Sequence, residues 1–288
     1  MSRRPLTAAL VSCVAIALVT SAAARPDTRV QLRVLRFVDR SREAQFSDGT
    51  SGPRVLGTQV RFPAAAGRPL PLVVFAHGFA LTPDTYSRLL DGWARAGYVV
   101  AAPVFPVEGT NARGGPSQRD LINEPGDLTF VLSRLIAPGS PVRKLIDPQH
   151  VAFAGQSDGA VAAFAASYER GYRDPRVDAA VIMSGAPLGA FTKTLPGAPP
   201  LLAVQGTADP YNAPATTATY FSHMRRPKFL LWLLGASHKQ PYTTDARYLG
   251  LVERTTIAFL DHYLRGGPLR PLIASGADAG ISRLVAEP

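Results

Sequence analysis

The ten residues that begin at Val151 read Val-Ala-Phe-Ala-Gly-Gln-Ser-Asp-Gly-Ala, and they decide how the rest of the chain is interpreted. A short apolar run ends in the pattern Gly-x-Ser-x-Gly, and a run of small residues follows. This order predicts a buried strand, a very tight turn and a helix, with Ser157 at the turn in a strained backbone conformation. Gly155, Gly159 and Ala160 are small enough to let the strand and the helix approach each other. Short Gly- and Ser-rich segments match the pattern by chance, but its place between a strand and a helix favours Ser157 as a nucleophile.

The segments around this stretch alternate between strand-like and helix-like patterns. Residues 30–38 and 55–62 alternate apolar and polar side chains as half-buried strands do, whereas residues 71–76 form the continuous apolar run of a strand covered on both faces. Further strands are expected at 98–102, 151–154, 177–183, 201–205 and 229–234, and helices at 84–96, around 128–136 and at 255–264. This alternation predicts one α/β domain with a mostly parallel sheet of about eight strands and helices on both faces.

Two connections bear on where a site would lie. A long loop rich in Gly and Pro is expected over residues 103–125, where it could form one wall of a pocket. Residues 185–200 are too few to form a large helical lid, so the predicted site is uncovered. In an open α/β sheet the loops that follow the parallel strands lie along one edge, and a site is expected there.

A serine hydroxyl needs a base within hydrogen-bond reach and a group that orients this base. Among the five histidines, only His77 and His238 follow strands on the edge that carries Ser157. His238 lies on a Gly-containing loop after the last predicted strand and is expected to be the base; a surface loop histidine is the alternative. Asp209 follows the preceding strand and is expected to orient the base, although aspartate before proline is also common in turns. The chain order Ser157, Asp209, His238 agrees with this topology.

The tetrahedral intermediate of acyl transfer needs N–H donors aimed at its oxyanion. One is expected from the backbone of Asp158, at the start of the helix, where its carboxylate is interpreted as a helix N-terminal charge. The other is expected from the backbone of Phe79, in the loop His77-Gly78-Phe79 that follows a buried strand. His77 and Gly78 are expected to support the shape of this loop, and His77 is not expected to act as a base.

The first 24 residues have the features of an export signal. Two arginines precede a largely apolar stretch, 6–19, and small residues end at Ala24. The stretch is too short and too rich in alanine for a stable membrane span. Cleavage near Ala24 would leave a catalytic domain, 25–288, that is secreted or associated with the cell envelope. The only cysteine, Cys13, lies in the signal next to a sequence that resembles a lipoprotein box, but the apolar stretch continues beyond it. The mature chain would therefore contain no disulfide or thiolate nucleophile.

The composition is that of a globular protein, with 46% hydrophobic and 18% charged residues. The 31 Lys and Arg against 21 Asp and Glu give a formal net charge of +10. Such an excess can attract acidic partners. The basic residues are scattered, however, and none of their runs exceeds two. No nucleic-acid partner is expected.

Four short motifs together resemble the α/β-hydrolase superfamily. They are His-Gly-Phe at 77–79, the Gly-x-Ser-x-Gly turn, Gly-Thr-Ala-Asp ending at Asp209 and Gly-Ala-Ser-His ending at His238. Within the superfamily the chain is similar to secreted esterases of the dienelactone-hydrolase-like, platelet-activating-factor acetylhydrolase-like and polyester hydrolase (cutinase-like) groups. The resemblance covers about residues 32–265. It implies a serine hydrolase that cleaves small carboxylic esters through an acyl-enzyme, with no cofactor and no metal.

Some positions depart from these groups. Dienelactone hydrolases proper use a cysteine nucleophile; polyester hydrolases usually have Met after the serine, Trp after the sixth strand and a disulfide. Here Asp158 follows the serine and residues 184–187 contain no Trp, which favours small esters over polymers. Two alternatives share the fold: an acyltransferase, in which an alcohol replaces water, and a catalytically silent binding protein. The complete set of triad and oxyanion positions argues against silence.

Overall fold

The structure is a computed structural model that describes residues 29–189 and 195–288. The expected export signal with Cys13 lies outside these residues. The strands are β1 (Val30–Gln45), β2 (Ser51–Pro63), β3 (Leu70–Ala76), β4 (Val99–Pro103), β5 (Ile146–Gln156), β6 (Ala179–Met183), β7 (Leu201–Gly206), β8 (Lys228–Leu233) and β9 (Ser282–Glu287). The α-helices are α1 (Ser87–Arg95), α2 (Glu124–Ile136), α3 (Asp158–Tyr168), α4 (Pro214–His223), α5 (Gln240–Thr243), α6 (Ala246–Arg265) and α7 (Arg270–Ser275). The 3₁₀ helices within the described ranges are η1 (Pro83–Tyr86), η2 (Gln118–Asn123) and η3 (Arg143–Leu145).

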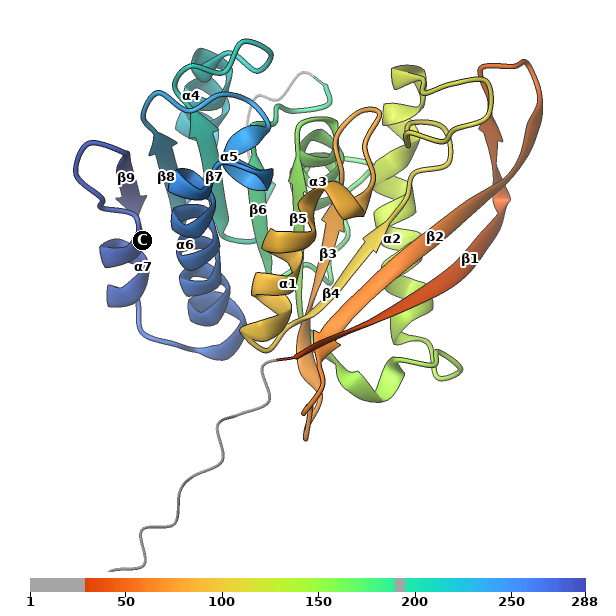
Figure 1. Ribbon diagram of the computed structural model, residues 1–288, viewed down its shortest axis with the longest axis horizontal. Helices are drawn as coiled ribbons and strands as arrows, with labels where there is room; N and C mark the ends of the chain where they lie inside the picture. The colour runs from red at the N-terminus through yellow and green to blue at the C-terminus, as the bar shows by residue number, and fades with distance from the viewer. Residues whose placement is uncertain (1–28, 190–194) are drawn as a thin grey trace, which may run out of the picture.

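The nine strands of the described residues form one open sheet in the order β1-β2-β4-β3-β5-β6-β7-β8-β9 (Figure 1). The six strands from β4 to β8 in this order are parallel. The long hairpin β1–β2 adds to one edge and β9 to the other, both in antiparallel pairing. The expected mostly parallel α/β sheet is confirmed.

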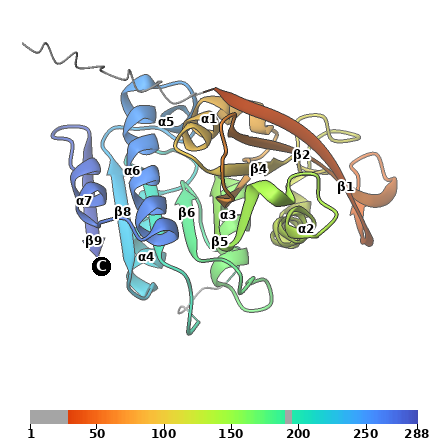
Figure 2. The ribbon, with the colours of Figure 1, turned by 90° about the horizontal axis from the view of Figure 1, so that it is seen from below.

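Helices cover both faces of the sheet, and each face has its own apolar core (Figure 2). Side chains of a strand alternate between the two faces. In β3, Leu72 and Val74 therefore join the core under α2, α3 and α4, whereas Val73 and Phe75 join the core under α1 and α6. This double burial explains why the parallel strands form continuous apolar runs in the sequence.

The structure corrects two expectations about individual segments. The strand β9 was not expected, because Ser-Arg-Leu-Val-Ala-Glu is short and half polar. The expected loop over 103–125 ends early, since η2 begins at Gln118 and α2 at Glu124. Pro125 suggested a loop, but proline fits the first turn of a helix, where its missing N–H would have no intrahelical partner.

A buried ion-pair network fixes η2 and α2 to the β1–β2 hairpin. Arg54 of β2 is fully buried, and its guanidinium donates two hydrogen bonds to Asp120 of η2, at 2.9 and 2.6 Å. The same group donates two more to Asp127 of α2, at 2.7 and 2.6 Å. Bidentate pairing of this kind sets orientation as well as distance. It holds η2 at the edge of the sheet where the parallel strands end.

The loops after β3, β5, β7 and β8 meet at this edge. They carry Phe79, Ser157, Asp209 and His238 in that order along the chain. None of the helices in the described ranges has the length and hydropathy to cross a membrane.

Candidate active site

Ser157 occupies the tight turn between β5 and α3. Its backbone has φ +58° and ψ −127°, a conformation that is costly for a residue other than glycine. A Cβ on Gly155 would lie 2.2 Å from the carbonyl oxygen of Gly159, and a Cβ on Gly159 would lie 2.3 Å from that of Ala76. Both contacts are impossible, so the turn requires glycine at both positions.

His238 links Ser157 to Asp209 by two short hydrogen bonds. The Nε2 atom of His238 lies 2.8 Å from Ser157 Oγ, and its Nδ1 atom lies 2.8 Å from Asp209 Oδ2. The Asp209 side chain is completely buried, whereas 13% of the His238 side chain is exposed. Thus the structure brings together the three residues that the sequence predicted as a triad, in the geometry that activates a serine hydroxyl.

The loop after β7 keeps Asp209 ionised. The backbone N–H groups of Tyr211 and Asn212 donate to its Oδ1, each at 2.9 Å, and Gln205 Nε2 donates to Oδ2. Burial alone would raise the pKa of Asp209, but the hydrogen bonds from His238, Asn212 and Tyr211 outweigh it and lower this pKa to about 2. A carboxylate at Oδ2 can only accept, so His238 carries its proton on Nδ1 and leaves Nε2 free to take the proton of Ser157.

His77 sets the orientation of the loop after β3. Its Nε2 accepts a hydrogen bond from the N–H of Phe105 at 3.1 Å, so the ring proton lies on Nδ1, which donates to the Gly78 carbonyl at 2.9 Å. Burial lowers the pKa of His77 to about 4, and the ring is neutral at pH 7. In a trans peptide the C=O and the following N–H point in opposite directions. The Phe79 N–H therefore points away from His77.

Two backbone N–H groups next to Ser157 are available to an oxyanion. Within the described part of the chain, neither the Phe79 N–H nor the Asp158 N–H donates to a protein acceptor. The Asp158 group belongs to the first turn of α3, where N–H groups have no intrahelical partner and carry partial positive charge. The Asp158 carboxylate accepts a hydrogen bond from Gln118 of η2 at 2.6 Å. A Cβ on Gly78 would lie 3.0 Å from that of Ser157, so Gly78 lets this loop approach the serine.

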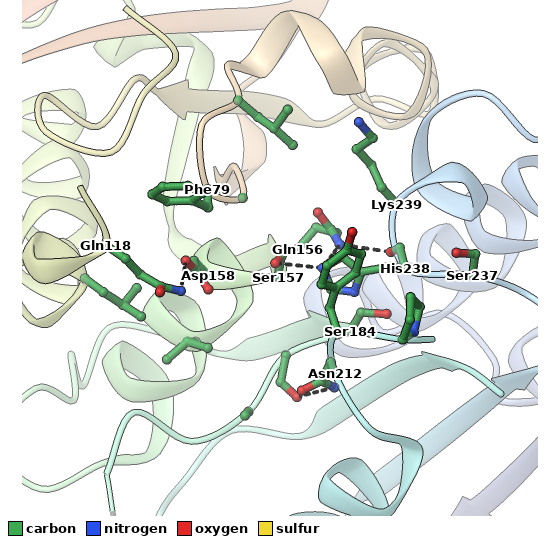
Figure 3. Close-up of a pocket in the computed structure, with 18 of the residues that line it drawn as sticks. Phe79, Gln118, Gln156, Ser157, Asp158, Ser184, Asn212, Ser237, His238 and Lys239 are labelled. Atoms are coloured by element: carbon green, nitrogen blue, oxygen red, sulfur yellow. Dashed lines mark hydrogen bonds between the residues drawn. The ribbon is translucent and has the colours of Figure 1, made fainter. Parts of the chain in front are cut away.

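A cleft of about 870 Å³ opens over Ser157 (Figure 3). Phe79, Gln118 and Asp158 lie to one side of the serine, whereas His238, Ser237 and Lys239 lie to the other. The segment expected as a long loop contributes Gln118 and Leu121, which belong to η2. Between β6 and β7 the described residues, 184–189 and 195–200, include no helix, and residues 185–188 line the cleft.

The sequence did not identify Tyr211 as part of the site. Its ring centroid lies 5.2 Å from that of His238, and 83% of the residue is exposed at the mouth of the cleft. Its only signal in the sequence is its position two residues after Asp209. No cluster of three potential metal ligands occurs among the described side chains.

Glu108 and Glu124 are both buried, and Glu108 contacts the loop that carries Phe79 through its backbone. The Glu108 carbonyl accepts a hydrogen bond from the Ala80 N–H at 3.0 Å. No other described residue donates to the side-chain oxygens of Glu108 or Glu124, so the two groups form a hydrogen bond only by sharing a proton. Burial and, next, the charge of Asp158 raise the pKa of Glu108 to about 8, although the contact with Glu124 opposes this rise. Burial and the charge of Glu108 raise the pKa of Glu124 well above its ordinary range.

Replacing Glu108 with glutamine is expected to flatten the pH dependence of stability. The folded pair retains a proton that the unfolded chain releases above pH 4.5, so the wild type loses stability as pH rises from 4.5 to about 8. Glutamine releases no proton in this range, so only the contribution of Glu124, whose pKa burial still raises, remains. The melting temperature should therefore fall less steeply with pH in Glu108→Gln than in the wild type or in Glu43→Gln, which alters an exposed carboxylate. Three parallel curves would show that Glu108 holds no such proton.

Comparison with known proteins places the chain in a family. The sequence model of the Chlorophyllase family matches residues 38–217, which is well over half of the chain. No curated protein matches the sequence. The solved structure of a ferulic acid esterase from Streptomyces cinnamoneus is similar, with a TM-score of 0.69 and 22% identity over 85% of this chain and 93% of that chain. At that identity the similarity shows a shared fold. The chain therefore belongs to the chlorophyllase family within the α/β-hydrolase superfamily, and it is a carboxylic ester hydrolase.

Proposed function

We propose that this hydrolase cleaves esters through a triad of Ser157, His238 and Asp209 and an acyl-enzyme intermediate. The observation that carries the proposal is the continuous hydrogen-bonded line from Ser157 Oγ through both ring nitrogens of His238 to Asp209. The N–H groups of Phe79 and Asp158, which donate to no acceptor among the described residues, support it, because an acyl-transfer site needs donors for the developing negative charge.

In acylation, His238 Nε2 takes the hydroxyl proton while Ser157 Oγ attacks the ester carbonyl carbon. The carbonyl oxygen becomes the oxyanion and accepts hydrogen bonds from the backbone N–H groups of Phe79 and Asp158. Asp209 is ionised at neutral pH because its pKa is far lower, and its negative charge stabilises the imidazolium. When the tetrahedral intermediate collapses, the bond to the leaving oxygen breaks, and His238 returns its proton to that oxygen, which departs as an alcohol.

In deacylation, water takes the place of the alcohol. His238 removes a proton from the water, whose oxygen attacks the acyl carbon, and the second oxyanion uses the same two N–H groups. Collapse breaks the bond to Ser157 Oγ and returns the proton to it. The products are a carboxylic acid and the free enzyme.

The proton transfers also require one orientation of the substrate. Because His238 must protonate the leaving oxygen, the alcohol part of the ester lies beside Nε2, on the side of Lys239. Tyr211, whose ring lies against that of His238, is on the same side. The acyl part then extends to the other side of Ser157. There the cleft is lined by Phe79 and by Val161, which follows Asp158 by about one turn of α3. We therefore expect an apolar acyl group and a more polar alcohol.

A series of p-nitrophenyl esters with about two to about sixteen acyl carbons tests this proposal. We expect hydrolysis with an optimum chain length, and Val161→Trp should move the optimum to shorter chains because the indole fills the acyl side. No hydrolysis of any member would contradict the proposal. Products in which an added alcohol carries the acyl group, formed faster than the free acid, would favour the acyltransferase alternative.

We also propose that the protein is exported. The support is the sequence itself: two arginines, an apolar stretch and small residues before Arg25. Protein recovered from the medium or the cell envelope is expected to begin at Arg25. Full-length protein that remains in the cytoplasm would contradict export.

A further inference from the structure

Gln156, the residue before the nucleophile, directs its side chain away from solvent and toward the loop that carries the base. It is 1% exposed. Its Nε2 donates a hydrogen bond to the backbone carbonyl of His238 at 3.0 Å and lies 3.4 Å from the His238 ring Nε2 (Figure 3). A carbonyl can only accept, so this contact fixes which end of the amide is nitrogen, and Oε1 must face the opposite way.

Tyr86, at the end of η1, meets that oxygen. Its hydroxyl donates to Gln156 Oε1 at 2.6 Å and accepts the backbone N–H of Gly78 at 3.2 Å. The side chain is fully buried, and its ring packs edge-on against Phe75 of β3, with centroids 4.8 Å apart. Burial raises the pKa of the Tyr86 hydroxyl far above its ordinary value, so it remains protonated and able to donate.

These contacts form one directed chain of donors: Gly78 N–H to Tyr86, Tyr86 to Gln156, and Gln156 to the His238 carbonyl. This series of hydrogen bonds joins the loop after β3, the last residue of β5 and the loop after β8. Its members are far apart in sequence, since Tyr86 and Gln156 are separated by 70 residues and Gln156 and His238 by 82. Every donor in it has an acceptor.

The chain acts on the two groups whose placement the proposed mechanism requires. The Gly78 C=O is held by His77 and the Gly78 N–H by Tyr86, so both peptide planes that flank Gly78 are fixed, including the plane that carries the Phe79 N–H. At the other end, Gln156 holds the His238 backbone, and this contact fixes the position of the imidazole relative to Ser157 Oγ.

We propose that Tyr86 and Gln156 are positioning residues that hold the Phe79 N–H and His238 in register with Ser157. This inference rests on the proposed triad mechanism and extends it to two residues that take no part in proton transfer. Tyr86 does not line the cleft. Its effect should therefore fall on the transition state, with little effect on binding of the ground-state substrate.

Tyr86→Phe is the sharpest test, because it removes one buried hydroxyl and keeps the ring against Phe75. We expect kcat to fall about 10- to 100-fold while KM changes less than about twofold, since small displacements of catalytic groups are costly. Binding of a trifluoromethyl ketone, which mimics the tetrahedral intermediate, should weaken in parallel with kcat/KM. The pH profile should keep its shape, because neither Tyr86 nor Gln156 titrates in the reaction.

Tyr98→Phe is the matched control. It also removes a buried tyrosine hydroxyl, one that donates to Asp261 of α6 at 2.6 Å, and it is expected to lower the melting temperature without changing kcat. If Tyr86→Phe lowers stability as Tyr98→Phe does but leaves kcat unchanged, the hydroxyl is only structural and the inference fails. Labelling of the wild type at Ser157 by a fluorophosphonate tests the triad separately, so the two failures are distinguishable.

A double-mutant comparison tests whether Tyr86 acts through Gln156. Gln156→Leu removes both amide contacts at similar volume and should lower kcat at least as much as Tyr86→Phe. The double variant should be no slower than Gln156→Leu alone, because both changes break the same chain. If the loss of kcat in the double variant equals the product of the two single losses, Tyr86 and Gln156 act independently, which would contradict one connected series of hydrogen bonds.

Discussion

Replacing Ser157 with alanine is expected to lower kcat for p-nitrophenyl esters by about 10⁴- to 10⁶-fold. The variant lacks the oxygen that would form the acyl-enzyme, and no other hydroxyl lies at hydrogen-bond distance from His238 Nε2 within the described residues. The fold should persist, because a methyl group is smaller than the hydroxymethyl group and the strained backbone of the turn depends on Gly155 and Gly159. Residual activity would come from the oxyanion donors and from substrate binding.

The control for this change is Ser167→Ala. Ser167 lies on the same helix, α3, and its hydroxyl only donates to the Ala163 carbonyl one turn earlier. In steady-state kinetics, Ser167→Ala should therefore keep the kcat of the wild type, and only Ser157→Ala should show the large loss. A Ser157→Ala enzyme that retains more than about a hundredth of wild-type kcat would show that another group is the nucleophile.

The second large effect is expected from Asp209→Asn, with a loss of about 10⁴-fold in kcat. Asn212 and Tyr211 donate to Oδ1, so the amide of asparagine would place its oxygen there and its nitrogen toward His238. That nitrogen donates to the imidazole Nδ1, which forces the ring proton onto Nε2. The base would then be blocked in the tautomer that cannot accept the proton of Ser157.

Asp245→Asn is the matched control for this substitution. Asp245 follows His238 in the chain and caps α6 by accepting the Arg247 N–H at 3.0 Å, a role that asparagine also fills. Its activity should equal that of the wild type. Equal activity of Asp209→Asn and the wild type, measured with the same ester, would remove Asp209 from the proposed triad.

Local sequence chemistry was sufficient to predict the tight turn at Ser157. Gly155 and Gly159 have to be small whatever surrounds them, because their neighbours across the turn are backbone atoms. His238 and Asp209 could be selected because a parallel sheet places the residues after its strands along one edge. The expected α/β-hydrolase superfamily is confirmed, although the resemblance did not name the chlorophyllase family to which the chain belongs.

The rest of the site depends on contacts between distant segments. Tyr86 forms an apolar stripe at helical spacing with Leu89, Leu90 and Trp93, which predicts only that its ring is buried. Nothing local shows that its hydroxyl contacts Gln156. Glu108 and Glu124 suggest a solvated loop until burial and mutual contact become visible. The polar strand β9 is recognisable only from its pairing with β8.

The most direct measurement of nucleophilicity at Ser157 is covalent trapping with a fluorophosphonate, followed by mass spectrometry of the peptides. The wild type should gain one phosphonyl group, located on Ser157, at a rate that matches its loss of esterase activity. Asp209→Asn should be modified far more slowly, and Ser157→Ala not at all. Modification of a different residue, or full loss of activity without modification of Ser157, would contradict the triad.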